Sequence, residues 1–326
     1  MIGSTQRDSA IPGEGLVQST AIVPRPTPTK QLLRSGRLAG VEWRDLVALT
    51  PLESTRELTL SLPWLALSLA VAGEHLYLPA LAASFMMFLT GLRQVHNGHH
   101  HALGLGRRAN EWFLFAMSVV MLGAMHAVKF NHLRHHKLCM GEGDVEAASA
   151  RMSGWRAIAF GPLFPLLLHR TALAKGNRRV RLWICAELAA NVAWIAAVFL
   201  WLRFDALRYH VIAMGVAQCL TAFFAVWTVH HDTTDTGYPA RTQRGRLRNF
   251  VSYHMFLHVE HHLFPQVPTC HLSTLARRLD RVMPELNLRQ VMQSSRAEPA
   301  CRGSPQSHEE HEDREWRCRR RDSPLQ

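Results

Sequence analysis

Long apolar runs alternate with polar segments along the chain, and this pattern predicts helices that cross a membrane. The main runs are Leu58–Leu92, with a polar break at residues 73–75, Leu182–Leu202 and Leu207–Val229. At a rise of about 1.5 Å per residue, the first run suffices for a hairpin of two short spans, and each later run for one span. We therefore expect an all-α integral membrane protein with about four transmembrane helices.

Two shorter apolar stretches do not fit this scheme as spans. Ala157–Leu168 is interrupted by proline and is too short to cross, whereas Trp112–Phe130 is long enough to do so. A crossing at Trp112–Phe130 would separate the histidine-rich segments before and after it onto opposite faces of the membrane. If these histidines form one site, Trp112–Phe130 lies in the interface plane or dips into the membrane and returns.

The charge distribution indicates which side of the membrane the loops occupy. The chain of 326 residues has 37 Lys and Arg against 25 Asp and Glu, and the excess is greatest between Arg93 and Arg181, beside the apolar runs. Such basic flanks are typical of cytoplasmic loops. Because no zinc-finger or RNA-binding signature accompanies them, we expect no nucleic-acid partner. The six cysteines contain no C-x-x-C pair, which argues against a disulfide framework and a thiolate zinc site.

Polar segments flank the apolar part of the chain. We expect a cytoplasmic N-terminal tail at 1–57, a membrane domain at 58–285 and a disordered C-terminal tail at 286–326. Within the first tail, the weakly amphipathic residues 38–52 suit an interfacial helix or a solvated one. The N-terminus has no signal-peptide pattern. The sequence thus predicts a multi-pass protein with both termini and a histidine-rich cap on the cytoplasmic side.

Half of the 20 histidines fall into clusters with regular spacing. H-x-x-H-H places three imidazoles on one face of a helix, and H-x-x-x-H places two. Together the clusters offer more nitrogen donors than one metal can take, which suits two metals, and imidazole binds iron, zinc, copper or nickel. The clusters are His96, His99, His100 and His101; His132, His135 and His136; and His258, His261 and His262.

These clusters resemble the histidine boxes of the membrane fatty acid desaturase and hydroxylase superfamily. The third cluster continues as Leu263-Phe264-Pro265 and then Val267-Pro268, which is similar to the continuation usual in that superfamily. Ala240-Arg241-Thr242 and the acidic run at 142–146 are also similar to desaturase sequences. The resemblance covers about residues 58–280. It implies a di-iron site at the cytoplasmic ends of a four-span bundle, with dioxygen as co-substrate.

The resemblance also implies a ligand set and leaves alternatives within it. His101 is an alternative to His100, His230 is an alternative to His231, and His99 is a bystander. His254 precedes His258 by four residues and is a possible further ligand if both lie on one helix. The implied ligands are His96, His100, His132, His135, His136, His231, His258, His261 and His262.

Four carboxylates beside the clusters are candidates for fixing the tautomers of the ligating imidazoles. Solvated loop carboxylates are the competing interpretation for each of them. The candidates are Asp144, Glu146, Asp232 and Glu260.

The function implied by the resemblance is desaturation of a lipid acyl chain. The alternatives are a hydroxylase or ketolase of the same superfamily, acting on a carotenoid, alkane or sphingolipid, and a histidine-rich metal transporter. A transporter would place its ligands at mid-membrane, whereas these clusters lie near span ends. The sequence has neither a G-x-G-x-x-G fingerprint nor a fused haem motif. We therefore expect an external electron donor, either a ferredoxin or a b-type cytochrome with its reductase.

Overall fold

The computed structural model describes residues 26–233 and 236–291. Its compact unit extends to Val291, and the remaining unit, 292–326, lies outside the described residues, as does 1–25. The described residues are helical, and their only β pairing is an isolated bridge between Thr242 and Gln290. The expected all-α class is confirmed for this part of the chain. The part of the predicted C-terminal tail from residue 292 onward lies outside the described residues.

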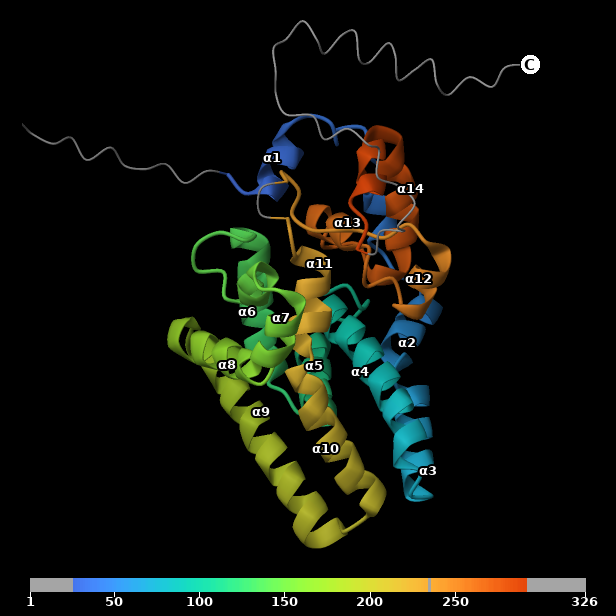
Figure 1. Cartoon of the computed structure of the whole chain (residues 1–326), viewed down its shortest axis with the longest axis vertical. Helices are drawn as coiled ribbons and strands as arrows, with labels where there is room; N and C mark the ends of the chain where they lie inside the picture. The colour runs from blue at the N-terminus through green and yellow to red at the C-terminus, as the bar shows by residue number, and fades with distance from the viewer. Residues whose placement is uncertain (1–25, 234–235, 292–326) are drawn as a thin grey trace, which may run out of the picture. The chain divides into compact units, whose positions relative to one another are not determined.

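Two helices are long and apolar enough to cross a membrane alone, namely α4 (Tyr77–His99) and the helix Arg178–Leu202. Three bent helix pairs would raise the number of spans to five if each pair crossed once. Figure 1 shows the C-terminal helices as a layer above the long helices. The structure therefore contains two to five candidate spans, a range that includes the four expected.

The predicted N-terminal hairpin is present but unequal in length. Helix α3 (Leu62–Gly73) packs along α4, and the turn that joins the two contains His75, which has a φ of 56°. Helix α2 (Pro51–Thr59) precedes it and begins with a capping box, in which the Thr50 hydroxyl accepts from the Glu53 N–H. The possible interfacial helix over residues 38–52 is not formed as one helix, because α2 begins only at Pro51. The short turn η1 (Arg44–Leu46) lies there instead, and Trp43 packs against Phe264 with ring centroids 5.3 Å apart.

The stretch Trp112–Phe130 does not form one straight helix. Helix α5 (Arg107–Met121) ends at Leu122, which has a left-handed φ of 54°, and α6 (Met125–Leu138) leaves at 113° to it. The bend returns the chain toward the C-terminal end of α4. A pair bent in this way is either a broken span or a segment that dips and turns back, and the bend carries His132 to the same end of the molecule as His96.

The Pro-interrupted stretch Ala157–Leu168 is also bent. Helices α7 (Gly154–Phe160) and α8 (Leu163–Lys175) meet at 63°, and α8 packs against α6. Gly161 lies at this corner, where a Cβ atom would be 1.8 Å from the Cys219 carbonyl oxygen. Only glycine permits this close approach of the α7–α8 corner to the chain at Cys219.

The remaining long helices form the second hairpin. Helix α9 (Arg178–Ala196) continues as the π-helical turn η3 (Ala197–Leu202), and α10 (Asp205–Cys219) returns. A bend of 41° separates α10 from the segment Ala222–His230, which comprises η4 (Ala222–Trp227) and α11 (Thr228–His230). Because of this bend, α11 ends beside the C-terminal layer, where His230 lies next to His258.

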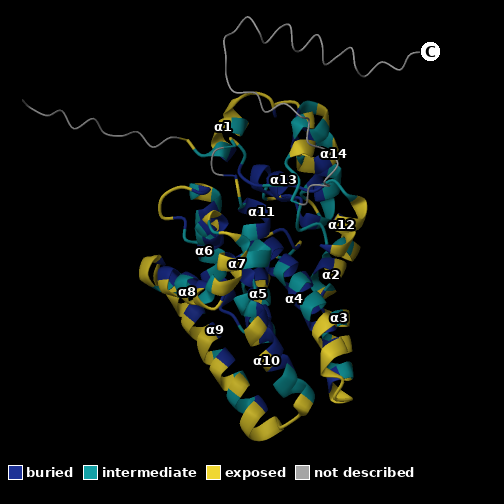
Figure 2. Cartoon of the chain, in the orientation of Figure 1, coloured by how far each residue is buried: buried dark blue, intermediate teal, exposed yellow. Residues whose placement is uncertain are grey.

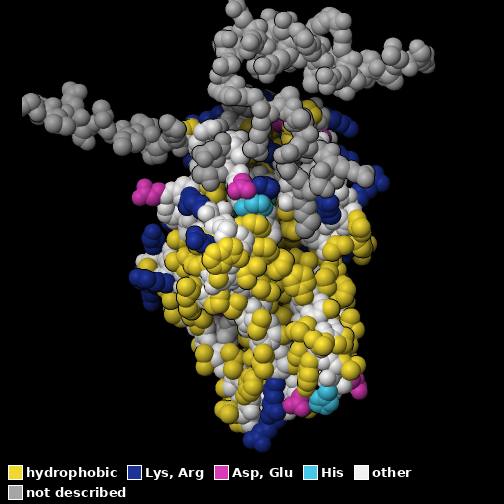
Figure 3. Space-filling model, in the orientation of Figure 1, with side chains coloured by type: hydrophobic (Ala, Val, Ile, Leu, Met, Phe, Trp, Pro, Cys, Tyr) yellow, Lys and Arg dark blue, Asp and Glu magenta, His cyan; other side chains and the backbone are white. Residues whose placement is uncertain are grey.

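The C-terminal layer has its own apolar core. Its elements are α1 (Pro28–Arg34), α12 (Arg246–Val251), α13 (His258–Leu263), η5 (Thr269–His271), α14 (Leu272–Val282) and η6 (Pro284–Leu288). Leu263, Leu272, Leu275 and Leu279 are fully or almost fully buried there. Figure 2 shows burial concentrated around α13 and α11, while much of α9 and α3 is exposed. Figure 3 shows that the exposed surface along these helices is largely hydrophobic, as expected for helices that face lipid.

Candidate metal centre

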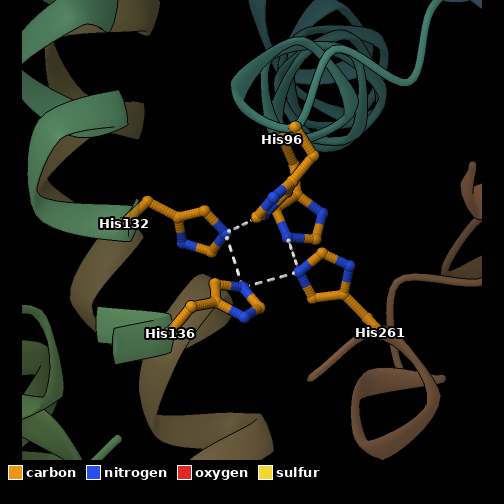
Figure 4. Close-up of side chains that lie close together, drawn as sticks. His96, His132, His136 and His261 are labelled. Atoms are coloured by element: carbon orange, nitrogen blue, oxygen red, sulfur yellow. Dashed lines mark hydrogen bonds between the residues drawn. The ribbon is translucent and has the colours of Figure 1, made fainter. Parts of the chain in front are cut away.

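Five imidazoles from three helices converge to form a first histidine group. His96 and His100 come from the end of α4, His132 and His136 from α6, and His261 from α13. The atoms that they offer to a metal all lie within 4.8 Å of one another. The Nε2 atom of His261 is 2.9 Å from those of both His96 and His136, and the Nε2 atoms of His132 and His100 are 2.9 Å apart. Figure 4 shows these rings pointing into one space.

A second histidine group lies beside the first. His135 of α6, His230 of α11 and His262 of α13 bring their ring nitrogens within 4.8 Å of one another. His258 joins this group, because its Nε2 atom is 3.1 Å from that of His230. The rings of His136 and His262 stack at 4.3 Å and so connect the two groups.

The H-x-x-H-H spacing divides each triplet between the groups. On α6, His132 and His136 enter the first group while His135 enters the second. On α13, His261 enters the first group while His262 enters the second. Residues three and four apart share a broad helix face, so a triplet spans the boundary between two adjacent sites. The pattern therefore builds two neighbouring groups from the same two helices.

Two of the four predicted carboxylates contact imidazoles. The Nδ1 atom of His135 lies 2.8 Å from Asp144 Oδ2, and the Nδ1 atom of His132 lies 2.8 Å from Glu146 Oε1. Asp144 also accepts from the backbone N–H groups of Met140 and Ala147, which fixes its position. Burial acts to raise the pKa of Asp144, but the hydrogen bond from His135 and these backbone donors outweigh it and lower that pKa. Asp144 is thereby held as an acceptor for the His135 ring.

The other two carboxylates do not contact the cluster. Asp232 is exposed and lies 3.3 Å from Arg241. Glu260 is fully buried, but it accepts from the Thr242 hydroxyl at 2.6 Å and pairs with Arg244 at 2.7 Å. Glu260 is part of α13, and these contacts tie that helix to the segment around Thr242. The proposed tautomer-fixing role of Asp232 and Glu260 is therefore not supported by their placement.

The structure places His230, and not the preferred His231, in the second histidine group. His230 is buried within the second group, and its Nε2 atom lies 3.1 Å from that of His135. His231 follows the end of α11, where its ring stacks on Trp227 at 4.1 Å and its Nδ1 atom donates to the Trp227 carbonyl. Neighbouring residues of a helix differ by about 100° in direction, so only one of the two can face the cluster.

His254 and His101 also lie outside both groups. His254 belongs to a turn and has a φ of 65°, and α13 begins only at His258, so the two do not share a helix face. The expectation that His254 extends the imidazole face is therefore wrong. His101 lies beyond the end of α4 with a φ of 57°, and its Nε2 atom faces Lys129 Nζ at 3.4 Å. His100, not His101, is the partner of His96.

Donor chemistry shows that the second group suits a cation. His135 donates its Nδ1 proton to Asp144, and His230 donates its Nδ1 proton to the Pro239 carbonyl at 3.0 Å. When both rings are neutral, each has a single N–H, so their Nε2 atoms present lone pairs to each other. Facing lone pairs repel unless a positive ion lies between them. Imidazole nitrogens of this kind fit a borderline transition metal such as iron.

A polar network beside the cluster escaped the sequence analysis. Glu57 of α2 pairs with Arg93, accepts from Asn97 at 3.1 Å, and is almost completely buried. Asn97 in turn accepts from the Thr269 hydroxyl at 2.6 Å. The network joins α2, α4 and the segment after α13, and so it aligns His96 with His261. Its only signal in the sequence is the pair Arg93 and Asn97 in the same turn as His96.

A second network joins the bent α5–α6 pair to α9. The buried carboxylate of Glu187 on α9 lies 2.7 Å from His126 Nδ1 on α6. The other nitrogen of His126 lies 2.7 Å from Glu111, which also pairs with Lys129 at 2.6 Å. The ring of His126 stacks on Trp183 at 4.7 Å. These contacts hold α6 against α9 without involving the histidine groups.

Comparison with known proteins agrees with this arrangement. Residues 74–294 match the model of the family described as "Fatty acid desaturase". The chain is 27% identical over 194 residues to the sphingolipid delta(4)-desaturase/C4-monooxygenase DES2 of Bos taurus, and 26% identical over 195 residues to that of Homo sapiens. Each match covers 55% of this chain and 58% of the relative. The chain thus spans little more than half the length of these relatives.

Proposed function

The chain belongs to the fatty acid desaturase family, and from that premise we propose that it is a membrane-bound, dioxygen-dependent di-iron oxidoreductase that introduces a double bond into a lipid chain. The observation that carries the proposal is the pair of adjacent histidine groups, each with at least three convergent nitrogen donors. Two irons held there would supply the activation of dioxygen needed to attack an unactivated C–H bond.

The proposed reaction balances with an external reductant. A CH2–CH2 unit, dioxygen, two electrons and two protons give a CH=CH unit and two waters. Four electrons reduce dioxygen, of which two come from the lipid and two from an electron donor. A ferredoxin or a b-type cytochrome is the class of donor that we propose, because the sequence has no dinucleotide-binding fingerprint of its own.

The protein's own contribution is to orient and shield the donor atoms. Asp144 and Glu146 hold the Nδ1 protons of His135 and His132, which leaves the Nε2 atoms free to bind metal. His258, His261 and His262 are each at most 5% exposed, so bulk water is excluded from that side. We propose that this end of the helices is cytoplasmic, because basic loops flank it.

The relatives suggest a substrate class. Both are named for desaturation and C4 monooxygenation of sphingolipids. We propose a sphingolipid chain as the substrate of this protein, with desaturation as the leading outcome. Hydroxylation of the same chain is the second candidate, because the name of the relatives includes both activities. Both reactions also begin with removal of one hydrogen atom.

The test is lipid analysis after expression in a host that lacks sphingolipid desaturation and hydroxylation. Desaturation predicts a product two hydrogens lighter than the host lipid, and hydroxylation predicts one that gains an oxygen atom from labelled dioxygen. His261→Ala should abolish either product and lower bound iron. His75→Ala, at an exposed histidine outside both groups, is the matched control. Product formation by iron-free protein would refute the proposal.

A further inference from the structure

A cavity of about 360 Å³ lies between α6 and α9, away from the histidine groups. Four of its six lining residues on α6 are spaced i, i+3, i+4 and i+7, which places them on one helix face. At about 100° per residue, this face is opposite to the one that carries the ligating histidines of α6. These lining residues are Phe130, Leu133, Arg134 and Lys137.

The wall of the cavity on α9 includes one aromatic side chain, which indicates a membrane interface. Trp183 lines the cavity and packs edge-on against Trp112 at 5.2 Å, and Trp112 is 61% exposed. Exposed tryptophans gather at the headgroup level of membranes. Figure 3 shows Lys and Arg side chains along the border of the hydrophobic surface, where such a level would lie. The cavity therefore opens where a lipid headgroup meets its acyl chain.

The charges of the cavity are unbalanced toward positive. The carboxylate of Glu111 is already occupied by Lys129 at 2.6 Å and His126 at 2.7 Å. By contrast, three other cations of the cavity form no ion pair with a carboxylate of the described residues. They are Arg134 and Lys137 from α6 and Arg179 from α9. Arg134 is held over the Phe130 ring at 5.7 Å. The rim thus presents three uncompensated cations above an apolar wall.

We infer that this cavity binds an anionic phospholipid of the surrounding membrane. Arg134, Lys137 and Arg179 would hold the phosphate, since guanidinium and ammonium groups are its usual partners. Phe130, Leu133 and Trp183 would contact the first part of an acyl chain. A soluble phosphate would use the cations alone, whereas a lipid uses both halves of the cavity. The bound lipid would connect α6 to α9 on the side of α6 that faces away from the histidines.

The experiment measures lipid retention by the full chain in detergent, using native mass spectrometry. The protein is equilibrated with phosphatidylglycerol or with phosphatidylcholine. The test variant is Arg134→Gln/Lys137→Gln/Arg179→Gln. The matched control, Arg170→Gln/Lys175→Gln/Arg178→Gln, removes three exposed cations nearby that do not line the cavity. Brominated phosphatidylglycerol gives a second readout, because bromine near Trp183 quenches its fluorescence and Trp183→Phe removes that quenched component.

We expect wild type and control to retain phosphatidylglycerol over phosphatidylcholine, and the test variant to lose about tenfold or more of that affinity. Millimolar inorganic phosphate should not displace the lipid. Equal losses in the test and control variants would show diffuse surface attraction and overturn the inference. Displacement by inorganic phosphate, or equal retention of phosphatidylcholine, would overturn it as well. If the test variant fails to fold, the Trp183→Phe variant still decides the question. If brominated phosphatidylglycerol quenches its fluorescence as much as that of wild type, the lipid does not lie in the cavity.

Discussion

The Nε2 atoms of His135 and His230 face each other at 3.1 Å, although the hydrogen bonds of both rings place their protons on Nδ1. The two residues lie 95 positions apart in the chain, on α6 and α11. Their approach therefore depends on the return of α6 and on the bend between α10 and α11. Metal binding between these atoms would relieve the repulsion of two lone pairs, so the pair offers a direct test of the second group.

Replacing His230 with Ala should remove the metal of the second group and leave that of the first. His231→Ala should retain both, because its ring stacks on Trp227 outside the groups. His254→Ala should likewise retain both metals. Metal content per chain, measured by mass spectrometry of elements, checks all three variants. Loss of metal in His231→Ala with none in His230→Ala would contradict the placement of α11.

Replacing Asp144 with Asn should weaken the metal of the second group without removing a ligand. The carboxamide accepts less strongly from His135 Nδ1, and loss of such a partner typically costs about 10–100-fold in metal affinity. Competition with a chelator measures the change. Asp232→Asn is the matched control, since that carboxylate is exposed and paired with Arg241. Equal chelator sensitivity of the two variants would argue against a role for Asp144.

Single cysteines at positions 109 and 142 should be labelled from the same side of the membrane. Ala109 at the start of α5 and Glu142 after α6 are both exposed, and the 113° bend places them on either side of a returning segment. A cysteine at Arg203, at the turn between α9 and α10, should label from the opposite side. An impermeant maleimide applied to sealed vesicles distinguishes the cases.

The native thiols interfere little with this labelling. Burial raises the pKa of Cys139 to about 11 and that of Cys270 to about 12, so neither is a thiolate at neutral pH. Cys185 and Cys219 lie within apolar helices, and Cys301 and Cys318 lie outside the described residues; all four are replaced by Ala in the background variant. Labelling of positions 109 and 142 from opposite sides would require the α5–α6 pair to cross the membrane.

Glu53 should stabilise the fold less as the pH falls through the acid range. Hydrogen bonds from His271 and Thr50 lower its pKa from 4.5 to about 2. A carboxyl whose pKa is lowered on folding contributes stability above its ordinary pKa and loses it as pH falls through the folded value. The difference in Tm between wild type and Glu53→Gln should therefore be full above pH 4.5 and shrink toward pH 2. Glu74→Gln, at an exposed turn, is the control. A Tm difference independent of pH would refute the assignment.

Local periodicity predicted the helical class and the convergence of the histidines within each cluster. The i, i+3 and i+4 spacings on α6 and α13 hold whatever the helices pack against, because they depend only on the geometry of a single helix. For the same reason, the apolar runs predicted the long helices α4 and α9. The need to gather all histidines on one face correctly indicated that Trp112–Phe130 could not be a single straight span, and the chain reverses at Leu122.

Tertiary structure decided which neighbours of these residues complete the centre. His230 and His231 are indistinguishable in the sequence, and only the direction in which α11 ends makes His230 face His135. His254 precedes His258 by four residues, a spacing that fits one helix face. The backbone at His254 is left-handed, however, and the helix begins only at His258. Asp144 contacts an imidazole, whereas Asp232 does not. Both lie in loops, and the path of a loop cannot be predicted from the spacing of residues on a helix.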